Sequence, residues 1–317
     1  MKKLLIIRFS ALGDVALLVP VVRALATQNP DLQITLLSQQ RMADLFADLP
    51  ANVHFLGVDL KKQSLRTIVS ELGHYDFVAD MHSVWRSWYM DLHMWLRGAK
   101  IALIHKGRWS KWLLTHGFIH RPLASTPQRY QNVINSLHGP IMDLQWTDNG
   151  PITTRQKCGI APFAAHPGKI YPLERMEQVV RLLSEQGEQV VLFGGKEDAN
   201  VLDAWAKKYQ NVTSVAGKYT LREELERMRS LRVMVSMDSA NMHLASLVGT
   251  RVVSIWGATH PNLGFLGYGQ KTTDCVQRDL PCRPCSTYGK KKCKYGDYRC
   301  MDIAPEEIVA RIKQTGQ

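Results

Sequence analysis

The segment RFSALGDVALLVP, residues 8–20, joins a short apolar strand to an apolar helix and places a carboxylate between them. The apolar run LLIIRF leads into Gly13 and Asp14, and a stretch of helical length follows at once. A strand followed directly by a helix is the unit from which doubly wound α/β sheets are built. The segment therefore predicts an α/β fold. It also leaves two roles open for Asp14, a cap on the first helix or a base beyond the end of the strand.

Short apolar runs alternate with segments of helical length along the rest of the chain. In the first half these runs are LLIIRF, LQITLLS, VHFLGV, YDFVAD and KIALIH. The pattern restarts after residue 156 with CGIAPFA, QVVLFGG, VTSVAG, VMVSMD and RVVSIWG. Such alternation predicts parallel sheets that are covered by helices on both faces.

The chain of 317 residues is long for one hydrophobic core and suits two domains. A polar stretch between Met142 and Gln156 contains Gly150 and Pro151 and is the predicted linker. We predict two doubly wound, Rossmann-like domains that face each other across a cleft, residues 1–150 and 151–317. The last helix, residues 305–317, could pack on either domain. Ligands of such sheets bind beyond the carboxyl ends of the strands.

The composition bounds the class of partner and the location. Lys and Arg number 40 against 28 Asp and Glu, a formal net charge of +12, which favours an anionic partner. The opening MKKLLII resembles an export signal, but its apolar run ends at Arg8, whereas such signals need about 7–15 apolar residues. The longest apolar run, Val15 to Val22, is far below the roughly 18 residues that span a bilayer. We therefore expect a cytoplasmic protein.

Three strand ends of the second half carry residues suited to a nucleotide diphosphate. A loop lysine offers three N–H donors to phosphate, glycines allow close backbone approach, and a helix N-terminus attracts an anion. An acid in the same region, Glu197, could accept a hydrogen bond from a ribose or a base. The predicted donor-binding residues are Lys169, His166, Gly194, Gly195, Glu197, Asp238, Ser239, Asn241 and His243. The alternative is that Asp238 or Ser239 only caps a helix and that His243 is a core residue.

Several common nucleotide-binding motifs are absent from the sequence. It contains no G-x-x-x-x-G-K-[ST] loop and no strand-linked G-x-G-x-x-G, which disfavours kinases of that loop type and common dehydrogenases. It also contains no D-x-D motif that would hold a magnesium-bound diphosphate. We therefore expect no metal and no cofactor, with the leaving-group charge met by Lys169 and backbone N–H groups.

Residues 85–130 form a basic stretch rich in tryptophan. They contain eight Lys and Arg and a single acid, Asp91, interleaved with aromatic residues. Such a surface suits an anionic sugar–lipid at a membrane interface, and single-stranded nucleic acid would suit it too. Alternatively, several of the tryptophans belong to the core. We assign Arg86 to a carboxylate or phosphate of the acceptor, and Ser10 and His82 to the same acceptor site.

Four cysteines near the end of the chain leave their chemistry open. Cys282, Cys285, Cys293 and Cys300 include one C-x-x-C pair and are compatible with zinc, but the following spacings do not match the usual finger or ribbon. A disulfide is a second alternative. Free thiols are the prediction, since the chain lacks an export signal.

With these residues in view, the sequence resembles glycosyltransferase family 9, the ADP-heptose:lipopolysaccharide heptosyltransferases. The resemblance spans nearly the whole chain and rests on RFSALGDVALLVP, HPGKIYPLERM, LFGGKED and DSANMHLASLVGTRVVSIWGATHP. Members of this family have the two-domain GT-B fold, bind a nucleotide-activated sugar on the second domain, and transfer it with inversion and without a metal. The resemblance implies that Asp14 is the catalytic base, that Lys169 binds the diphosphate, and that Asp238, Ser239 and His243 belong to the donor site.

The implied function is transfer of a heptose or similar sugar from ADP-heptose to the anionic inner core of lipopolysaccharide. The implied location is the cytoplasm, peripheral to the inner membrane, with no nucleic acid as partner. Two alternatives stay open. One is a nucleic-acid-binding protein with a basic aromatic surface and a zinc-bound cysteine tail, and the other is a sugar-nucleotide epimerase or hydrolase of the same fold.

Overall fold

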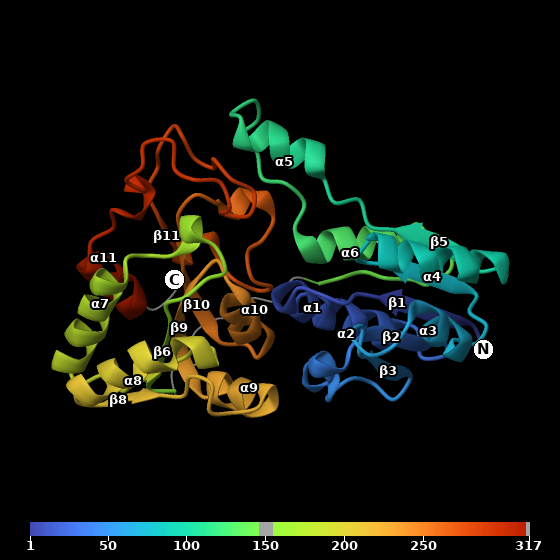
Figure 1. Ribbon diagram of the computed structural model, residues 1–317, viewed down its shortest axis with the longest axis horizontal. Coiled ribbons are helices and arrows are strands. Elements are labelled where there is room, and N and C mark those ends of the chain that lie inside the picture. Colours follow the sequence, from blue (N-terminus) through green and yellow to red (C-terminus); the bar gives the residue numbers. More distant parts are fainter. Residues whose placement is uncertain (146–154, 315–317) are drawn as a thin grey trace. The chain divides into compact units, whose positions relative to one another are not determined.

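The computed structural model describes residues 1–145 and 155–314 and divides the chain into two compact units (Figure 1). The first unit comprises Met1–Lys106 and Thr126–Gln145. The second comprises Gly107–Ser125 and the described residues from 155 onward. Residues 107–125 thus group with the second unit, whereas the sequence placed them in the first domain. The predicted boundary after residue 150 lies outside the described residues.

The first unit is built on a parallel sheet of five strands in the spatial order β3-β2-β1-β4-β5. All five apolar runs predicted in this half form strands. The strands are β1 (Lys3–Ile7), β2 (Gln33–Gln39), β3 (Val53–Val58), β4 (Phe77–Asp80) and β5 (Lys100–Leu103). The α-helices are α1 (Leu12–Ala16), α2 (Leu18–Gln28), α3 (Leu65–Glu71), α4 (Trp85–Leu96) and α6 (Thr126–Asn135).

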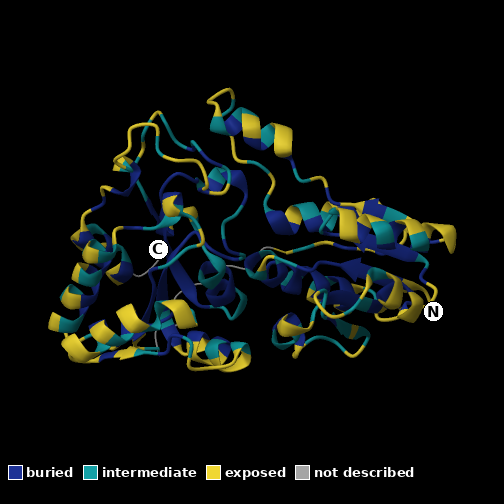
Figure 2. Cartoon of the chain, viewed as in Figure 1, coloured by how far each residue is buried: buried dark blue, intermediate teal, exposed yellow. Residues whose placement is uncertain are grey.

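The burial of the central strand explains its sequence. Leu4, Leu5, Ile6 and Ile7 of β1 are all fully buried, and the central strands of both sheets are largely dark blue in Figure 2. A parallel strand covered on both faces has no polar side, so it appears in sequence as a continuous apolar run. The chain reverses its direction of travel across the sheet between β1 and β4, so this sheet has its topological switch point there.

The second unit contains a parallel sheet of six strands in the order β11-β10-β9-β6-β7-β8. Its switch point lies between β6 and β9. The strands are β6 (Lys157–Ala161), β7 (Val190–Leu192), β8 (Val212–Ser214), β9 (Leu231–Met237), β10 (Arg251–Trp256) and β11 (Cys275–Gln277), of which only β11 was not predicted. The α-helices are α5 (Arg108–Thr115), α7 (Leu173–Glu185), α8 (Ala199–Lys208), α9 (Leu221–Arg229), α10 (Ala240–Leu247) and α11 (Pro305–Lys313).

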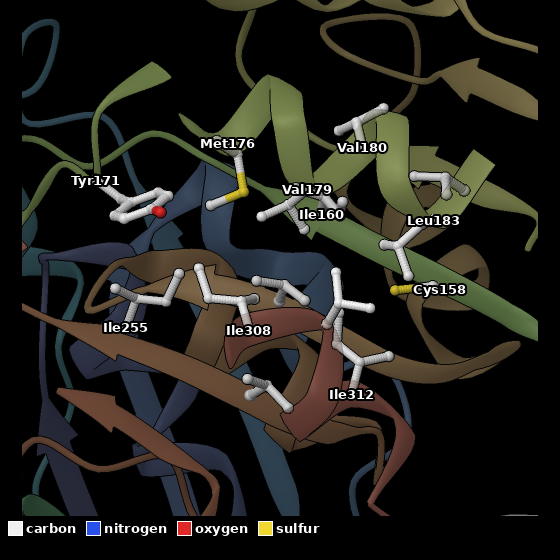
Figure 3. Close-up of a cluster of buried hydrophobic side chains, with 14 of the residues drawn as sticks. Cys158, Ile160, Tyr171, Met176, Val179, Val180, Leu183, Ile255, Ile308 and Ile312 are labelled. Carbon is white, nitrogen blue, oxygen red and sulfur yellow. The ribbon is translucent and has the colours of Figure 1, made fainter. Parts of the chain in front are cut away.

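The core of the second unit also decides the place of the last helix. Helix α11 packs against α7, and Ile308 and Ile312 belong to the same buried cluster as Met176, Val180 and Leu183 (Figure 3). The apolar residues recur at intervals of three or four along α7, the spacing that lines one face of a helix. The last helix therefore packs within the second unit.

Candidate active site

The switch point of the first unit joins the ends of β1 and β4. The two strands pair in parallel register, with Ile7 opposite Asp80. Their carboxyl ends therefore lie at one edge of the sheet, where doubly wound folds bind their ligands. The segment after β1 carries Arg8, Ser10 and Asp14, and the segment after β4 carries His82.

Asp14 is held mainly by an ion pair. It lies in the first turn of α1, and its Oδ2 is 2.5 Å from Nη2 of Arg8. The N–H of Ala11 also donates to Asp14 Oδ2, but at 3.4 Å this capping bond is long. The Asp14 side chain is 32% exposed. Capping is therefore a minor part of its surroundings, and the carboxylate can be reached by a substrate.

Arg8 was not among the predicted site residues. Its guanidinium is buried, donates to the carbonyl oxygen of Met81 and lies 5.9 Å from the ring centroid of Tyr130. The Tyr130 hydroxyl in turn donates to the backbone carbonyl of Asp14 at 3.1 Å. Arg8 thus connects the end of β1, the segment after β4 and Asp14. The signal in the sequence was a basic residue directly after a buried apolar strand.

Asp80 organises the segment that begins α4. Its Oδ1 accepts hydrogen bonds from the N–H groups of His82 and Ser83, at 2.7 and 2.8 Å, and its Oδ2 accepts one from the hydroxyl of Ser87 at 2.7 Å. The side chain of Asp80 is fully buried. Asp91 of α4 lies beside it, and burial together with the neighbouring Asp80 charge raises the pKa of Asp91. Neither carboxyl oxygen of Asp91 has a hydrogen-bond partner among the described residues, and a protonated Asp91 avoids a second buried charge beside Asp80.

We expect Asp91 to make the stability of the first unit fall as pH rises. Burial first, and then Asp80, raise the pKa of Asp91 from 3.8 to about 8. The folded state therefore binds more protons than the unfolded state between about pH 4 and pH 8, and its stability declines across that window. Asp91→Asn keeps a neutral side chain of the same size beside Asp80 and should remove the decline, worth on the order of 1–3 kcal/mol. Urea unfolding at pH 5 and pH 8 measures this.

The matched control is Asp31→Asn, at an exposed aspartate of the same unit. Its stability should follow that of the unchanged chain at both pH values. Equal losses for the unchanged chain and Asp91→Asn between pH 5 and pH 8 would contradict a protonated Asp91.

The predicted acceptor residues all follow β1 or β4. Ser10 and His82 are half-buried and Arg86 is exposed at the start of α4. His82 packs edge-on against Phe9, with ring centroids 5.9 Å apart, and burial and then Arg8 lower the pKa of His82 to about 4. A neutral imidazole is therefore available there to a hydroxyl group. The Arg86 guanidinium lies 5.3 Å from the ring centroid of Trp85.

The tryptophans of residues 85–130 are not core residues. Every one of them is exposed: Trp85, Trp88, Trp95, Trp109 and Trp112. The alternative that placed several of them in the core is therefore wrong. In the described parts of the chain, no helix combines the length and the apolar character needed to cross a membrane.

The switch point of the second unit is marked by a buried ion pair. Lys169 follows β6, Asp238 follows β9, and Lys169 Nζ lies 2.8 Å from Asp238 Oδ2. The side chains are 14% and 4% exposed. Thr259, beyond the end of β10, donates its hydroxyl to the same Asp238 oxygen at 2.8 Å. Residues from three adjacent strand ends thus meet around one carboxylate.

The interpretation that Asp238 or Ser239 caps α10 through its side chain is wrong. Ser239 is the N-cap residue of α10, but its side chain makes no capping hydrogen bond. The Ser239 hydroxyl lies 3.2 Å from that of Ser236, while Asp238 is engaged with Lys169 and Thr259. The first N–H groups of α10 therefore have no cap from Ser239, as an anion-binding helix start requires.

Comparison with known proteins decides the family. Residues 127–296, more than half of the chain, match the model of glycosyltransferase family 9 (heptosyltransferase). The chain belongs to glycosyltransferase family 9. It is therefore a glycosyl-transferring enzyme.

Individual relatives of this family 9 enzyme agree. It is 23% identical to lipopolysaccharide heptosyltransferase 3 of Escherichia coli over 280 residues, which cover 78% of this chain and 81% of that protein. A family 9 glycosyltransferase structure from Veillonella parvula matches with a TM-score of 0.74 and 18% identity, covering 99% and 97% of the two chains. The E. coli ADP-heptose LPS heptosyltransferase II structure matches with a TM-score of 0.71 and 18% identity, covering 98% and 97%. The predicted α/β fold with two doubly wound sheets is confirmed.

The remaining predicted residues of the family 9 enzyme lie at the same edge of the second sheet. Strands β9, β6 and β7 are neighbours, as the sequence predicted for the donor site. His166 precedes the 3₁₀ turn Pro167–Lys169, and Asn241 and His243 lie in the first turns of α10, with His243 buried.

The glycines after β7 are explained by packing of the protein itself. A Cβ on Gly194 would lie 2.8 Å from Cδ1 of Leu202 and 2.9 Å from Cβ of Asp198. The N–H of Gly195 donates to Asp198 Oδ2 at 2.8 Å, so Asp198 closes this turn. Glu197 is exposed beside it. The structure brings this strand end to the same sheet edge as Lys169, and a role for its residues in binding the donor stays a prediction.

The cysteine-containing segment supports the loop that carries Lys169. Gly168 donates to the carbonyl of Gly289 at 3.1 Å, and Ala258 donates to the carbonyl of Gly168 at 2.8 Å. Gly289 has φ +75°, and a Cβ there would lie 2.6 Å from Cγ of Lys169. A side chain at this position would therefore strain the backbone and displace Lys169.

Arg283 connects this segment to the end of β10, and the sequence carried no signal for it. The guanidinium is largely buried, and burial lowers the pKa of Arg283. Its partners within the described chain are carbonyl and amide oxygens, those of Trp256, Gly257, Thr259, Arg278 and Gln277. Arg283 thereby fixes the loop from which Thr259 reaches Asp238.

The four cysteines of the tail face one small enclosed cavity. Cys282, Cys285, Cys293 and Cys300 all line it, together with Arg283. No disulfide joins them. Within residues 1–145 and 155–314, no three His, Cys, Asp or Glu side chains are placed to hold a metal ion. That these thiols stay free is still a prediction, with a bound metal as the alternative.

Proposed function

We propose that this enzyme transfers a heptose or similar sugar from ADP-heptose to the inner core of lipopolysaccharide, with inversion and without a metal. The observation that carries the proposal is the buried Lys169–Asp238 pair at a switch point, directly before the start of α10. A cation and the N–H groups of a helix start are the groups that bind a diphosphate. The names of the relatives support ADP-heptose as donor and lipopolysaccharide as acceptor.

In this proposal, Asp14 is the catalytic base of the first unit. An acceptor hydroxyl attacks the anomeric carbon of the sugar and forms the new C–O bond, while the bond to the diphosphate oxygen breaks. The hydroxyl proton passes to the Asp14 carboxylate, whose Oδ2 is held by Arg8 at 2.5 Å. One displacement of this kind inverts the configuration, so one base suffices. Ser10, His82 and Arg86 would bind the acceptor around it.

The second unit would stabilise the leaving group. Lys169 has three N–H donors and shares one with Asp238, so the others can reach phosphate oxygens. The backbone N–H groups at the start of α10 add partial positive charge. Asp238 and Thr259 hold the ammonium in position before the substrate arrives, which is how preorganised charge stabilises a transition state.

Titration calorimetry with ADP, UDP, GDP and CDP tests the donor. We expect ADP to bind at least tenfold more tightly than the others, and equal affinities would contradict an adenine-nucleotide donor. Transfer is then measured with ADP-heptose and a deacylated core acceptor, in the presence of EDTA. ADP should be released only when the acceptor is present. Release without the acceptor would favour the hydrolase alternative, and conversion of ADP-heptose without release of ADP would favour the epimerase. Loss of activity in EDTA would contradict a metal-independent reaction.

The acceptor suggests where the enzyme works. Lipopolysaccharide core is anionic and linked to lipid, and the chain carries a net charge of +12. We therefore propose a cytoplasmic enzyme that is peripheral to the inner membrane, with no nucleic acid as partner.

A further inference from the structure

Helix α4 presents a wide apolar face that the first unit leaves exposed. The exposed apolar side chains are Trp85, Trp88, Leu92, Trp95 and Leu96, each 52–68% exposed. At about 100° per residue they fall within an arc of roughly 100° on the helix surface. The opposite side buries Met90 and Met94 in the core of the first unit. In Figure 2, exposed residues recur along the length of α4.

The exposed charges of α4 itself and of the segment that follows it are basic. Arg86 lies at the start of α4, about 80° beyond the edge of this face, and Lys100 follows the helix in β5, both of them exposed. Arg97 donates its guanidinium N–H groups to the carbonyls of Leu72 and Val69. The single acid of α4, Asp91, is buried on the core side beside Asp80. A row of indole and leucine side chains bordered by cations matches a surface of anionic headgroups above hydrocarbon.

The helix also has a fixed relation to the candidate acceptor residues. It begins at Trp85, five residues after β4 ends at Asp80, and therefore starts at the edge of the sheet that carries Asp14. Lys106 donates to the carbonyl of Ser83 at 2.8 Å and fixes the turn before the helix. A surface that holds α4 would thus lie near Arg86, the residue assigned to the acceptor.

We propose that the exposed face of α4, comprising Trp85, Trp88, Leu92, Trp95 and Leu96, docks this enzyme on an anionic lipid bilayer. The indole rings lie at headgroup depth, the two leucines reach the acyl boundary, and the long side chains of Arg86 and Lys100, at the two ends of the helix, extend to lipid phosphates. The proposal rests on the proposed function, since a lipid-linked acceptor is presented at such a surface. It assigns the bilayer contact to one helix of the first unit.

A second exposed aromatic cluster, in the other unit, provides a matched comparison. Trp109 and Trp112 of α5 stack on each other, with ring centroids 5.0 Å apart, and Trp112 also stacks on Phe118 at 5.6 Å. Trp109 and Phe118 remain 69% and 67% exposed, so the two clusters differ in extent and not in exposure. Three rings gather at α5, whereas five apolar side chains line the whole length of α4. We therefore expect α4, and not α5, to dominate binding to lipid.

Cosedimentation of the full chain with vesicles tests the docking. Vesicles of phosphatidylcholine with about 30 mol% phosphatidylglycerol are compared with vesicles of phosphatidylcholine alone. The double variant Leu92→Ser/Trp95→Ser removes two exposed side chains from the end of α4 remote from Arg86. It should bind the anionic vesicles at least tenfold more weakly than the unchanged chain. Trp109→Ser/Phe118→Ser on α5 should keep at least half of the affinity.

Three outcomes would overturn the proposal. The first is unchanged vesicle binding by Leu92→Ser/Trp95→Ser, and the second is an equal loss of binding in the α5 control. The third is a dimer in light scattering that only the α4 variant abolishes, because that result would assign the face to a second copy of the chain. Thermal unfolding checks that both variants fold. Transfer to a deacylated, water-soluble acceptor should be unchanged in the α4 variant. Absence of transfer in every form of the enzyme would refute the proposed function. The vesicle measurements would still test the docking proposal, because they do not depend on transfer.

Discussion

Replacing Asp14 with Asn is expected to lower kcat for sugar transfer by about 10²–10⁴-fold, the range for loss of a general base. The amide cannot take the acceptor proton, but its oxygen can still accept a hydrogen bond from Arg8 Nη2, which lies 2.5 Å from Asp14 Oδ2 in the unchanged chain. The first unit should therefore stay folded. Steady-state kinetics with ADP-heptose and a deacylated acceptor measures the loss.

Two controls separate chemistry from structure in this experiment. ADP affinity, measured by calorimetry, should change less than threefold in Asp14→Asn, because the Lys169–Asp238 pair and α10 belong to the other unit. Asp14→Glu keeps the carboxylate but moves it by one methylene, so it should retain more activity than Asp14→Asn. A normal kcat for Asp14→Asn would refute the assignment of the base.

Replacing Lys169 with Ala should lower kcat by about 10²–10³-fold, as for loss of one donor that stabilises developing negative charge. ADP should also bind at least tenfold more weakly, since the same ammonium faces the diphosphate in the ground state. Kinetics and calorimetry measure the two effects. Lys207→Ala, at an exposed lysine of α8, is the matched control and should behave like the unchanged chain.

The buried partner of Lys169 makes a second variant necessary. Lys169→Ala leaves Asp238 buried, 4% exposed, with Thr259 as its remaining side-chain donor, and an uncompensated buried charge destabilises a fold. The double variant Lys169→Ala/Asp238→Asn removes that charge. It should recover thermal stability without recovering kcat. Recovery of both would mean that Lys169 acts only on folding and would contradict its role at the leaving group.

The strands and their ends could be predicted because their burial leaves a local trace. Residues of β1 and β9 are buried on both faces, so each strand appears as an apolar run followed by a change to glycine or a polar residue. The ends of such runs pointed to Asp14, Lys169 and Asp238. The short β11 was missed because only Cys275 and Val276 are apolar there, whereas β7 and β8, also of three residues, lie within the longer runs QVVLFGG and VTSVAG.

The partners of the site residues could not be predicted, because they come from distant segments. Thr259 reaches Asp238 across 21 positions, and Arg8 reaches the carbonyl of Met81 across 73. No periodicity within a window of ten or twenty residues records such pairs. Arg283 illustrates the same limit, because it fixes its loop through five oxygens that come together only in the folded second unit.

The sequence by itself determined the fold class, the positions of ten strands and the family resemblance, because short-range patterning reports burial and local motifs directly. Only the tertiary structure decided the order of the strands, the ion pairs Arg8–Asp14 and Lys169–Asp238, and the grouping of residues 107–125 with the second unit. It also decided that α4 buries its methionines and exposes its tryptophans. The physical reason is that removal from water favours an apolar side chain equally on either face of a helix. Only the packing of the whole chain therefore selects which face is covered.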